Sequence, residues 1–397
     1  MGELRGHFTP GEKWVQALSD SFFVSRWGKR NEIRKVVKKA GVLSCQGLRK
    51  MLELPRNTPT MENILEISKL SMHFPVRAGV FGQRMGTLKA VDDVSLSIAP
   101  GETLGLVGES GCGKSTLGRC IVRLLEPTSG TIRFMRHNVT HRAQWRLRSL
   151  RRKVQMVFQD PAGALNPRMT VRHLIAEPLE IHGLGTSAGR RRRVAALLDL
   201  VGLPSTALEK FPHEFSGGQK QRIGIARALA MGPKLLVLDE PVSALDVSVQ
   251  SQVLNLLLNL QQELNLSYLF ISHDLSVVRH ISDRVAVMYM GKIVEMADAD
   301  RLYDHPCHAY TRALLSAIPI PDPMLQQRTP ILPGDVPSPI DPPPGSAFGR
   351  RINHPYLDAT VGMDLTPREL EPGHWVAPDP CAVSLTDMQK LGVDIYQ

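Results

Sequence analysis

The residues with the clearest chemistry form a glycine-rich loop that is typical of phosphate binding. The run Gly108-Glu109-Ser110-Gly111-Cys112-Gly113-Lys114-Ser115-Thr116 matches the pattern Gly-x-x-x-x-Gly-Lys-Ser/Thr in full. Its glycines let the backbone curl so that N–H groups face the phosphates of a nucleotide. Lys114 would neutralise β- and γ-phosphate charge, and the Ser115 hydroxyl would bind Mg²⁺. We therefore expect ATP and Mg²⁺ as cofactors, bound by these nine residues.

Two adjacent acids follow the apolar run 235–238. Ligands bind at the carboxyl edge of a parallel sheet, so acids at the end of a buried strand lie where a nucleotide would. Asp239 is expected to hold Mg²⁺ through water, and Glu240 to accept a proton from the attacking water as general base. The alternative is that both acids cap a helix, which Pro241 and the presence of the phosphate loop disfavour.

Two further polar residues also follow apolar runs. Gln159 follows 154–158, and its amide would contact both Mg²⁺ and the attacking water without adding charge. His273 follows 268–271, and its imidazole would contact the γ-phosphate. Either residue alone is more often structural, so the weight of each comes from its place among the other motifs.

A second anion site is predicted by Ser216-Gly217-Gly218-Gln219-Lys220-Gln221-Arg222. A serine and two glycines at a helix start leave backbone N–H groups free at the positive end of the helix dipole. The phosphate loop is already a better site for the same kind of ligand. The second site therefore needs a different explanation.

The elements around these motifs alternate between strand-like and helical patterns, which indicates an α/β fold with a mainly parallel sheet and helices on both faces. Strands are expected at 102–107, 154–158, 235–238 and 268–271, and a hairpin at 284–296 around Gly291. Helices are expected at 114–125, 246–264, 275–281 and within about 170–210. The arginines at 190–193 are interpreted as a solvated helix face.

Composition bounds the class of protein. The net charge is +10, but residues 1–60 hold 12 Lys and Arg against 5 Asp and Glu, so residues 61–397 carry only +3. That distribution argues against nucleic acid as a partner. The five cysteines show no zinc spacing and suit a reducing compartment. No apolar run approaches the roughly 18 residues of a membrane helix, so any membrane role is expected to be peripheral.

Three segments are expected along the chain. Residues 1–60 are expected to form a basic N-terminal extension: either Met61 is the natural start, or these residues are a dispensable arm. An ordinary N-terminal helix packed on the core is the alternative. Residues 61–320 hold the nucleotide-binding domain, with a helical subdomain at about 160–215. Residues 321–397 form a Pro-rich linker, too rich in proline for regular structure, and a polar tail.

Together these motifs, in this order, resemble the ATP-binding cassette (ABC) family over roughly residues 62–320. The resemblance implies a P-loop NTPase core with an antiparallel β subdomain and an inserted helical subdomain. It implies that Ser216, Gly217, Gly218 and Gln219 face the phosphate loop of a second ATPase subunit, with ATP between the two. It also implies that Asp246 lies at the dimer seam and that Phe74 stacks on adenine; a core phenylalanine is the alternative for Phe74.

The segments 305–315 and 318–323 are similar to the oligopeptide/dipeptide/nickel importer group, and the insert 76–86 resembles its F-type subunit. Many members of that group read Gly-Cys-x-Phe-x-x-Arg-Cys-Pro in the tail. This chain reads Gly345-Ser346-Ala347-Phe348-Gly349-Arg350-Arg351-Ile352-Asn353. An iron–sulfur cluster needs about four thiolates, so this tail alone does not predict one.

The resemblance implies an import ATPase on the cytoplasmic face of the bacterial inner membrane. Its partners would be a second ATPase subunit, two integral-membrane permeases and, indirectly, a solute-binding protein. A heterodimer of ATPase subunits is expected, with a homodimer as the alternative. Peptide is the expected cargo, with nickel, sugars or opines left open. The rival hypothesis is a soluble ABC ATPase acting on ribosomes or nucleic acid, which the nearly neutral cassette disfavours. A metabolic kinase would leave 216–222 unexplained.

Overall fold

The computed structural model describes residues 62–78, 83–318, 334 and 336–392. All of these belong to one compact unit that begins at Met61. The expectations for residues 1–60 lie outside the described residues.

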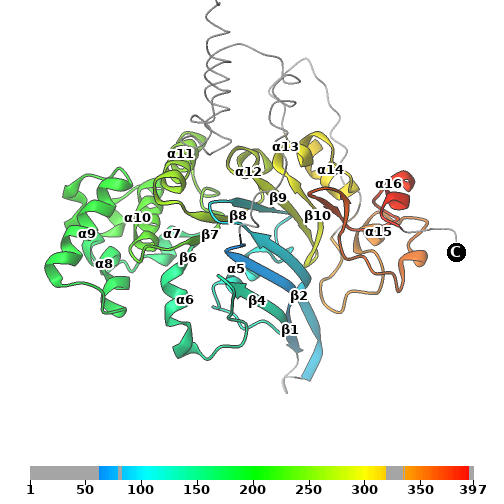
Figure 1. The fold of residues 1–397 in the computed structure, drawn as a ribbon, viewed down its shortest axis with the longest axis horizontal. Coiled ribbons are helices and arrows are strands. Elements are labelled where there is room, and N and C mark those ends of the chain that lie inside the picture. The colour runs from blue at the N-terminus through cyan, green and yellow to red at the C-terminus, as the bar shows by residue number, and fades with distance from the viewer. Residues whose placement is uncertain (1–61, 79–82, 319–333, 335, 393–397) are drawn as a thin grey trace, which may run out of the picture. The chain divides into compact units, whose positions relative to one another are not determined.

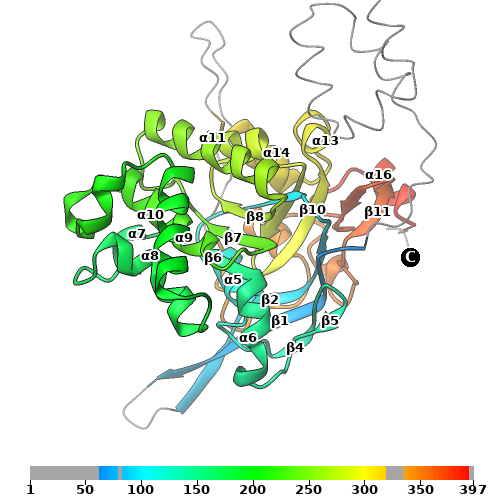
Figure 2. The same ribbon diagram turned by 60° about the vertical axis from the view of Figure 1, so that its left-hand side comes forward.

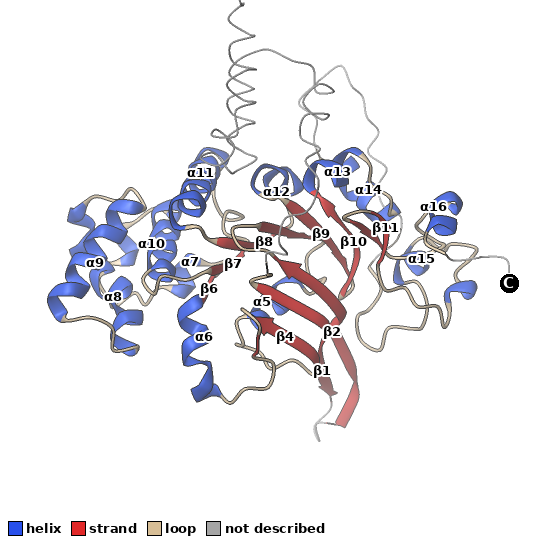
Figure 3. Ribbon diagram, in the orientation of Figure 1, coloured by secondary structure: helices blue, strands red, loops and turns tan. Residues whose placement is uncertain are grey.

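The fold is organised by an eight-stranded sheet with the order β11-β12-β10-β9-β3-β8-β7-β6 (Figure 3). The strands from β9 to β6 are parallel, and β10, β12 and β11 continue the sheet in antiparallel fashion. The expected mainly parallel sheet and the hairpin around Gly291 are confirmed. The strands are β3 (Thr103–Val107), β6 (Val154–Val157), β7 (Leu235–Asp239), β8 (Ser267–Ser272), β9 (Arg284–Tyr289), β10 (Lys292–Asp298), β11 (Arg368–Glu371) and β12 (His374–Val376).

The parallel strands are buried on both faces. In β7, Leu236 and Leu238 pack into one hydrophobic cluster, while Leu235 and Val237 pack into another. The first cluster contains the helices α8 to α12; the second contains α5 (Lys114–Ile121) and a four-stranded antiparallel sheet, β2-β1-β4-β5. Its strands are β1 (Leu65–Ala78), β2 (Gln83–Ile98), β4 (Ser129–Phe134) and β5 (His137–Asn138). Helices therefore cover one face, and a helix with the smaller sheet covers the other (Figure 1).

A group of helices is inserted between β6 and β7 and lies at one end of the large sheet (Figure 1, green). Its members are α7 (Pro161–Ala164), α8 (Val171–Ile181), α9 (Ser187–Leu200) and α10 (Gly217–Leu229). On α9, Arg191, Arg192 and Arg193 are exposed, as a solvated face requires. This is the inserted helical subdomain that the sequence led us to expect.

The helix expected at 114–125 is shorter than predicted. It ends at Ile121 because Arg123 adopts a left-handed backbone conformation, with φ of +57°, which a continuing α-helix excludes. The remaining helices are α6 (Arg148–Lys153), α11 (Val247–Leu264), α12 (Leu275–Ile281), α13 (Ala299–Asp304) and α14 (Ala309–Ser316).

The C-terminal region, defined as residues 336–392, is more structured than its composition predicts. β12 pairs with β10 and so extends the central sheet, and β11 pairs with β12. The helices α15 (Ala347–Arg351) and α16 (Leu385–Lys390) complete this region (Figure 1, orange and red). A small core of Val376, Val383, Met388 and Leu391 holds it. The tail from Gly345 was expected to be polar, and its described part still folds because its few apolar side chains are gathered by contacts distant in sequence.

Candidate active site

The phosphate loop joins β3 to α5 and is tightly enclosed by backbone. A Cβ at Gly108 would clash with the carbonyl oxygen of Met288, and a Cβ at Gly113 with that of Ala90. Both glycines have positive φ, 154° and 108°. No side chain caps the start of α5, so its first N–H groups remain available to an anion.

Lys114 is the cation of this loop and is 4% exposed. Its Nζ donates hydrogen bonds to the carbonyl oxygens of Gly108 and Glu109, both at 2.8 Å. The ammonium therefore lies within the curl of the loop, beside the uncapped helix start. A buried cation and free N–H groups together fit the phosphate groups of a nucleotide.

Ser115 and Asp239 form a neighbouring pair. The Ser115 Oγ donates to Asp239 Oδ1 at 2.8 Å, and Asp239 is 1% exposed. Burial raises the pKa of Asp239, and the hydrogen bond from Ser115 opposes that shift. A hydroxyl and a carboxylate side by side are the hard oxygen ligands that Mg²⁺ prefers, so this pair fits the ion.

Glu240 is the centre of a three-residue cluster. The Gln159 Nε2 donates to Glu240 Oε2 at 2.8 Å, and His273 Nδ1 lies 3.3 Å from Oε1. Glu240 has a left-handed backbone with φ of +46°, held by an N–H bond to the carbonyl of Ile271 at 2.9 Å. Only 11% of its side chain is exposed. The carboxylate is thus fixed in orientation by an amide and an imidazole.

The order of the strands explains why these residues meet. β3, β8, β7 and β6 are neighbours and parallel, so their carboxyl ends lie along one edge. Along that edge lie the phosphate loop after β3, His273 after β8, Asp239 and Glu240 at the end of β7, and Gln159 after β6. We refer to these residues as the catalytic row.

Comparison with known proteins decides the family. The family model described as "ABC transporter" matches residues 91–243. The family model described as "Oligopeptide/dipeptide transporter, C-terminal region" matches residues 294–355. The oligopeptide transport ATP-binding protein AppF of Bacillus subtilis is 50% identical over 321 residues, which are 80% of this chain and 97% of AppF. This chain belongs to the ATP-binding cassette family. It is an ATPase of the oligopeptide/dipeptide transport group.

Other relatives agree. A putative peptide import ATP-binding protein of Brucella ovis is 50% identical over 79% of this chain and 96% of its own length. Among solved structures, the ATP-binding cassette MJ0796 in a dimeric post-hydrolysis state with ADP and Pi is 28% identical. It has a TM-score of 0.53 and covers 59% of this chain and 98% of its own. The cassette cbiO1 of Clostridium perfringens has the same TM-score, 0.53, at 28% identity, over 62% and 92%. None of these supports the ribosome or nucleic-acid alternative.

Among the described residues, no hydrogen bond or ion pair links the predicted second anion site at Ser216 to the catalytic row. Ser216 and Gln219 cap α10 reciprocally: Ser216 Oγ accepts the N–H of Gln219 at 3.4 Å, and Gln219 Oε1 accepts the N–H of Ser216 at 3.0 Å. Ser216, Gly217 and Gln219 are exposed, whereas Gly218 packs so closely on Val249 that a Cβ would clash. The helix start is preorganised and faces solvent.

Two other predicted residues are explained only in part. Phe74 lies on β1, half-buried, opposite Leu88 of the long β1–β2 hairpin (Figure 2). Ala90 of the same hairpin borders Gly113, so Phe74 is on the element next to the phosphate loop. Asp246 accepts the N–H of Val249 and caps α11, which accounts for its position without a partner chain.

Two residues that no sequence motif predicted contact the phosphate loop at Glu109. The Arg351 Nη1 lies 2.8 Å from Glu109 Oε2, and the Tyr310 hydroxyl accepts the N–H of Glu109 at 3.0 Å. Arg351 comes from α15 of the C-terminal region and Tyr310 from α14, and both are more than 200 positions away from Glu109. No local pattern signals contacts of this kind.

Three possible metal ligands come together where β12 of the C-terminal region pairs with β10. One ligand atom from each of Glu295, Cys307 and His374 falls within 4.8 Å of the others. The fully buried carboxylate, however, already accepts bonds from His374 Nε2 and the N–H groups of Cys307 and His308 at 2.8, 2.7 and 3.0 Å. Burial would raise the pKa of Glu295, and these bonds more than offset it. We interpret the cluster as an anchor between β10, α14 and β12.

The environment of Cys112 predicts its reactivity. Burial raises the pKa of its thiol above the usual value, although Lys114 opposes the shift, and only 8% of the residue is exposed. Since the thiolate is the reactive form, alkylation by N-ethylmaleimide should be slow at pH 7 and rise about tenfold per pH unit up to pH 9. Bound ATP should slow it further.

The measurement is the labelling rate by mass spectrometry between pH 7 and pH 9, with and without ATP. A Cys112→Ser variant reports labelling of the other thiols. Rapid labelling at pH 7 that ATP does not slow would place Cys112 outside the nucleotide site.

Proposed function

We propose that this ATPase powers import of peptides, or of a related small solute, through membrane permeases. The observation that carries the proposal is the convergence of Gln159 and His273 on Glu240, beside Lys114 and the Ser115–Asp239 pair. Relatives with matching sequence over four fifths of the chain are described as oligopeptide transport and peptide import ATP-binding proteins. Because these relatives are described by peptide transport or import, we propose peptide as the cargo of this ATPase.

Each residue of the catalytic row has a role that its contacts allow. The N–H groups of the phosphate loop and Lys114 bind the phosphates, and Phe74 stacks on the adenine. Ser115, Gln159 and Asp239 would hold Mg²⁺, which would supply positive charge to the phosphate oxygens. Glu240 orients the attacking water and accepts its proton at the carboxylate, and His273 contacts the γ-phosphate.

A second ATPase subunit completes the site. Ser216, Gly217, Gly218 and Gln219 form an anion-binding helix start, and the contacts of Ser216 lie within that helix start. Such a start fits the phosphates held by another copy or a related subunit. Hydrolysis then opens a dimer that ATP had closed.

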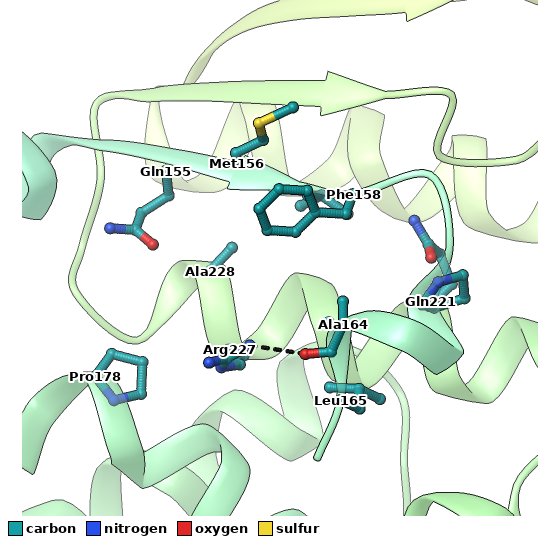
Figure 4. Close-up of a pocket in the computed structure, with 12 residues that line it drawn as sticks. Gln155, Met156, Phe158, Ala164, Leu165, Pro178, Gln221, Arg227 and Ala228 are labelled. Atoms are coloured by element: carbon teal, nitrogen blue, oxygen red, sulfur yellow. Dashed lines mark hydrogen bonds between the residues drawn. The ribbon is translucent and has the colours of Figure 1, made fainter. Parts of the chain in front are cut away.

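A groove between the catalytic row and the helical subdomain fits a permease segment. It has a volume of about 170 Å³ and lies between β6, α7, α8 and α10 (Figure 4). Phe158 at its edge is 38% exposed, and Arg227 braces its floor by donating to the carbonyl of Ala164 at 3.1 Å. Because Gln159 follows Phe158 directly, movement of this groove would reach the catalytic row.

Permeases bound in this groove would lie, together with the membrane, on this side of the ATPase. In the described part of the chain, no helix combines the length and apolarity needed to cross a bilayer. We propose a peripheral position on the cytoplasmic face of the inner membrane, with a solute-binding protein acting through the permeases.

The role of Glu240 is tested by Glu240→Gln. Loss of the general base should lower ATP turnover by at least about 100-fold while ATP is still bound, so that closed dimers accumulate. Turnover and dimer content by size-exclusion chromatography are the measurements, with Glu263→Gln on the exposed face of α11 as the matched control. Unchanged turnover would show that Glu240 is not the base.

The shared site is tested by combining Ser216→Arg with Lys114→Ala in dimers of two differently tagged copies. If Ser216 serves the partner's phosphate loop, placing one substitution on each copy damages a single site and leaves the other complete. Placing both on one copy then damages both sites and abolishes turnover. The opposite pattern of ATPase activity would assign Ser216 to its own loop.

The permease groove is tested by Gly224→Trp on α10. A Cβ at Gly224 meets no atom within 4 Å, so a side chain can begin there without a clash, and Gly224 lines the groove that the indole is meant to occupy. Co-purification with the permeases should fall at least about tenfold, since the docking surface is occupied. Ala196→Trp on the exposed face of α9 is the matched control, and equal thermal unfolding of both variants excludes misfolding. Undiminished co-purification would place the permeases elsewhere.

A further inference from the structure

Glu109 is an acid inside a loop that binds an anion. It is the only acidic residue among the nine of the phosphate loop. A carboxylate close to a triphosphate raises the free energy of the bound state through like-charge repulsion, which weakens binding unless a cation neutralises it.

Arg351 is placed to neutralise that acid. Its guanidinium forms an ion pair with Glu109 at 2.8 Å, and only 7% of the Arg351 side chain is exposed. An ion pair this shielded is screened less than one on the surface. The described part of the chain shows no other ion pair to Glu109.

The backbone around Arg351 is held firmly. Arg351 is the last residue of α15, whose first turn is capped by Ser346 Oγ accepting the N–H of Gly349 at 2.7 Å. Phe348 of the same helix packs on Tyr289 and Tyr310, with ring centroids 6.0 and 6.1 Å away. Tyr310 in turn accepts the N–H of Glu109. The Arg351 guanidinium and the Tyr310 hydroxyl therefore both contact Glu109, and the helices that carry them pack together through Phe348.

A second contact of the C-terminal region reaches the other side of the loop. The N–H of Lys89 donates to the carbonyl of Pro339 at 3.2 Å, and the N–H of Asp341 to the carbonyl of Thr87 at 3.0 Å. These bonds fix β2 next to Ala90, whose carbonyl oxygen borders Gly113. The phosphate loop thus lies between two supports from the C-terminal region.

We propose that Arg351 is a positioning residue for ATP binding: it neutralises Glu109 and holds the carboxylate on the side of the C-terminal region, away from the phosphates. The C-terminal region then sets the nucleotide affinity of the ATPase. This inference rests on the phosphate loop being the nucleotide site, as proposed above.

A purely structural role for Arg351 makes a different prediction. If Arg351 only anchors α15, removing its charge disturbs the loop whether or not Glu109 is charged. If Arg351 neutralises Glu109, removing both charges restores binding. The second substitution therefore separates the two roles.

The experiment compares Arg351→Met, Glu109→Gln and the double variant in the full chain. Affinities for ATP and ADP are measured by isothermal titration calorimetry, and KM and kcat by phosphate release. Arg351→Met should weaken ATP binding about tenfold, with a smaller effect on ADP, which carries less charge. KM should rise with little change in kcat. The double variant should bind ATP within about twofold of the unchanged chain.

Arg350→Met is the matched control, because Arg350 is the preceding residue, its guanidinium donates to the carbonyl of Pro344 at 3.5 Å, and it forms no ion pair with any described residue. Its affinity should equal that of the unchanged chain. A double variant as weak as Arg351→Met, or an Arg351→Met variant with unchanged affinity, would overturn the inference. Should Arg351→Met fail to fold, Glu109→Gln alone decides: it leaves an unneutralised cation by the loop, so ATP should bind more tightly, and weaker binding would overturn the inference.

Lys114→Ala separates this inference from the proposed function. If Lys114→Ala binds ATP as tightly as the unchanged chain, the nucleotide site itself is wrong. If Lys114→Ala loses ATP while Arg351→Met binds it normally, the site stands and only the inference about Arg351 fails.

Discussion

The parallel pairing of β3, β8, β7 and β6 is the constraint on which the rest of the structure depends. Parallel neighbours bring their carboxyl ends to one edge, and each of these strands is followed there by a polar residue or loop. The strands are buried on both faces, so their register is fixed by packing on two sides. Because packing on both faces fixes the register of these strands, it also fixes the positions of the residues in the catalytic row.

Charge is the second constraint. The ATPase gathers three acids around a site for a polyanion, and each acid has its own partner. Asp239 accepts from Ser115, Glu240 is held by Gln159 and His273, and Glu109 is paired with Arg351. An unpartnered acid in this position would repel the nucleotide and lose orientation. The partners come from four different parts of the chain, so the electrostatics of the site depend on the whole fold.

The nucleotide site also depends on groups that lie outside the catalytic row. The C-terminal region supports the phosphate loop through Glu109 and β2, and the capped helix start at Ser216 faces solvent, where we propose that it meets a second subunit. We infer that nucleotide chemistry in this family member depends both on the folding of the C-terminal region and on a second subunit.

The sequence by itself determined the phosphate loop, the acids after the strand at 235–238, the family and most of the parallel sheet. These are local properties, because glycine spacing, a lysine at a helix start and apolar runs of strand length each depend only on residues that are close in sequence. Where a prediction was local but wrong, as for the end of α5, a single left-handed residue, Arg123, was decisive.

The tertiary structure alone decided which polar residues meet. Gln159 and Glu240 are 81 positions apart, and Glu109 and Arg351 are 242 apart. The order of the strands brings the first pair together, and the packing of α15 on Tyr289 and Tyr310 brings the second. The same applies to β12, which joins β10 through backbone hydrogen bonds that carry no side-chain signal. Contacts between distant residues depend on the sum of many packing interactions, so they became visible only in the folded chain.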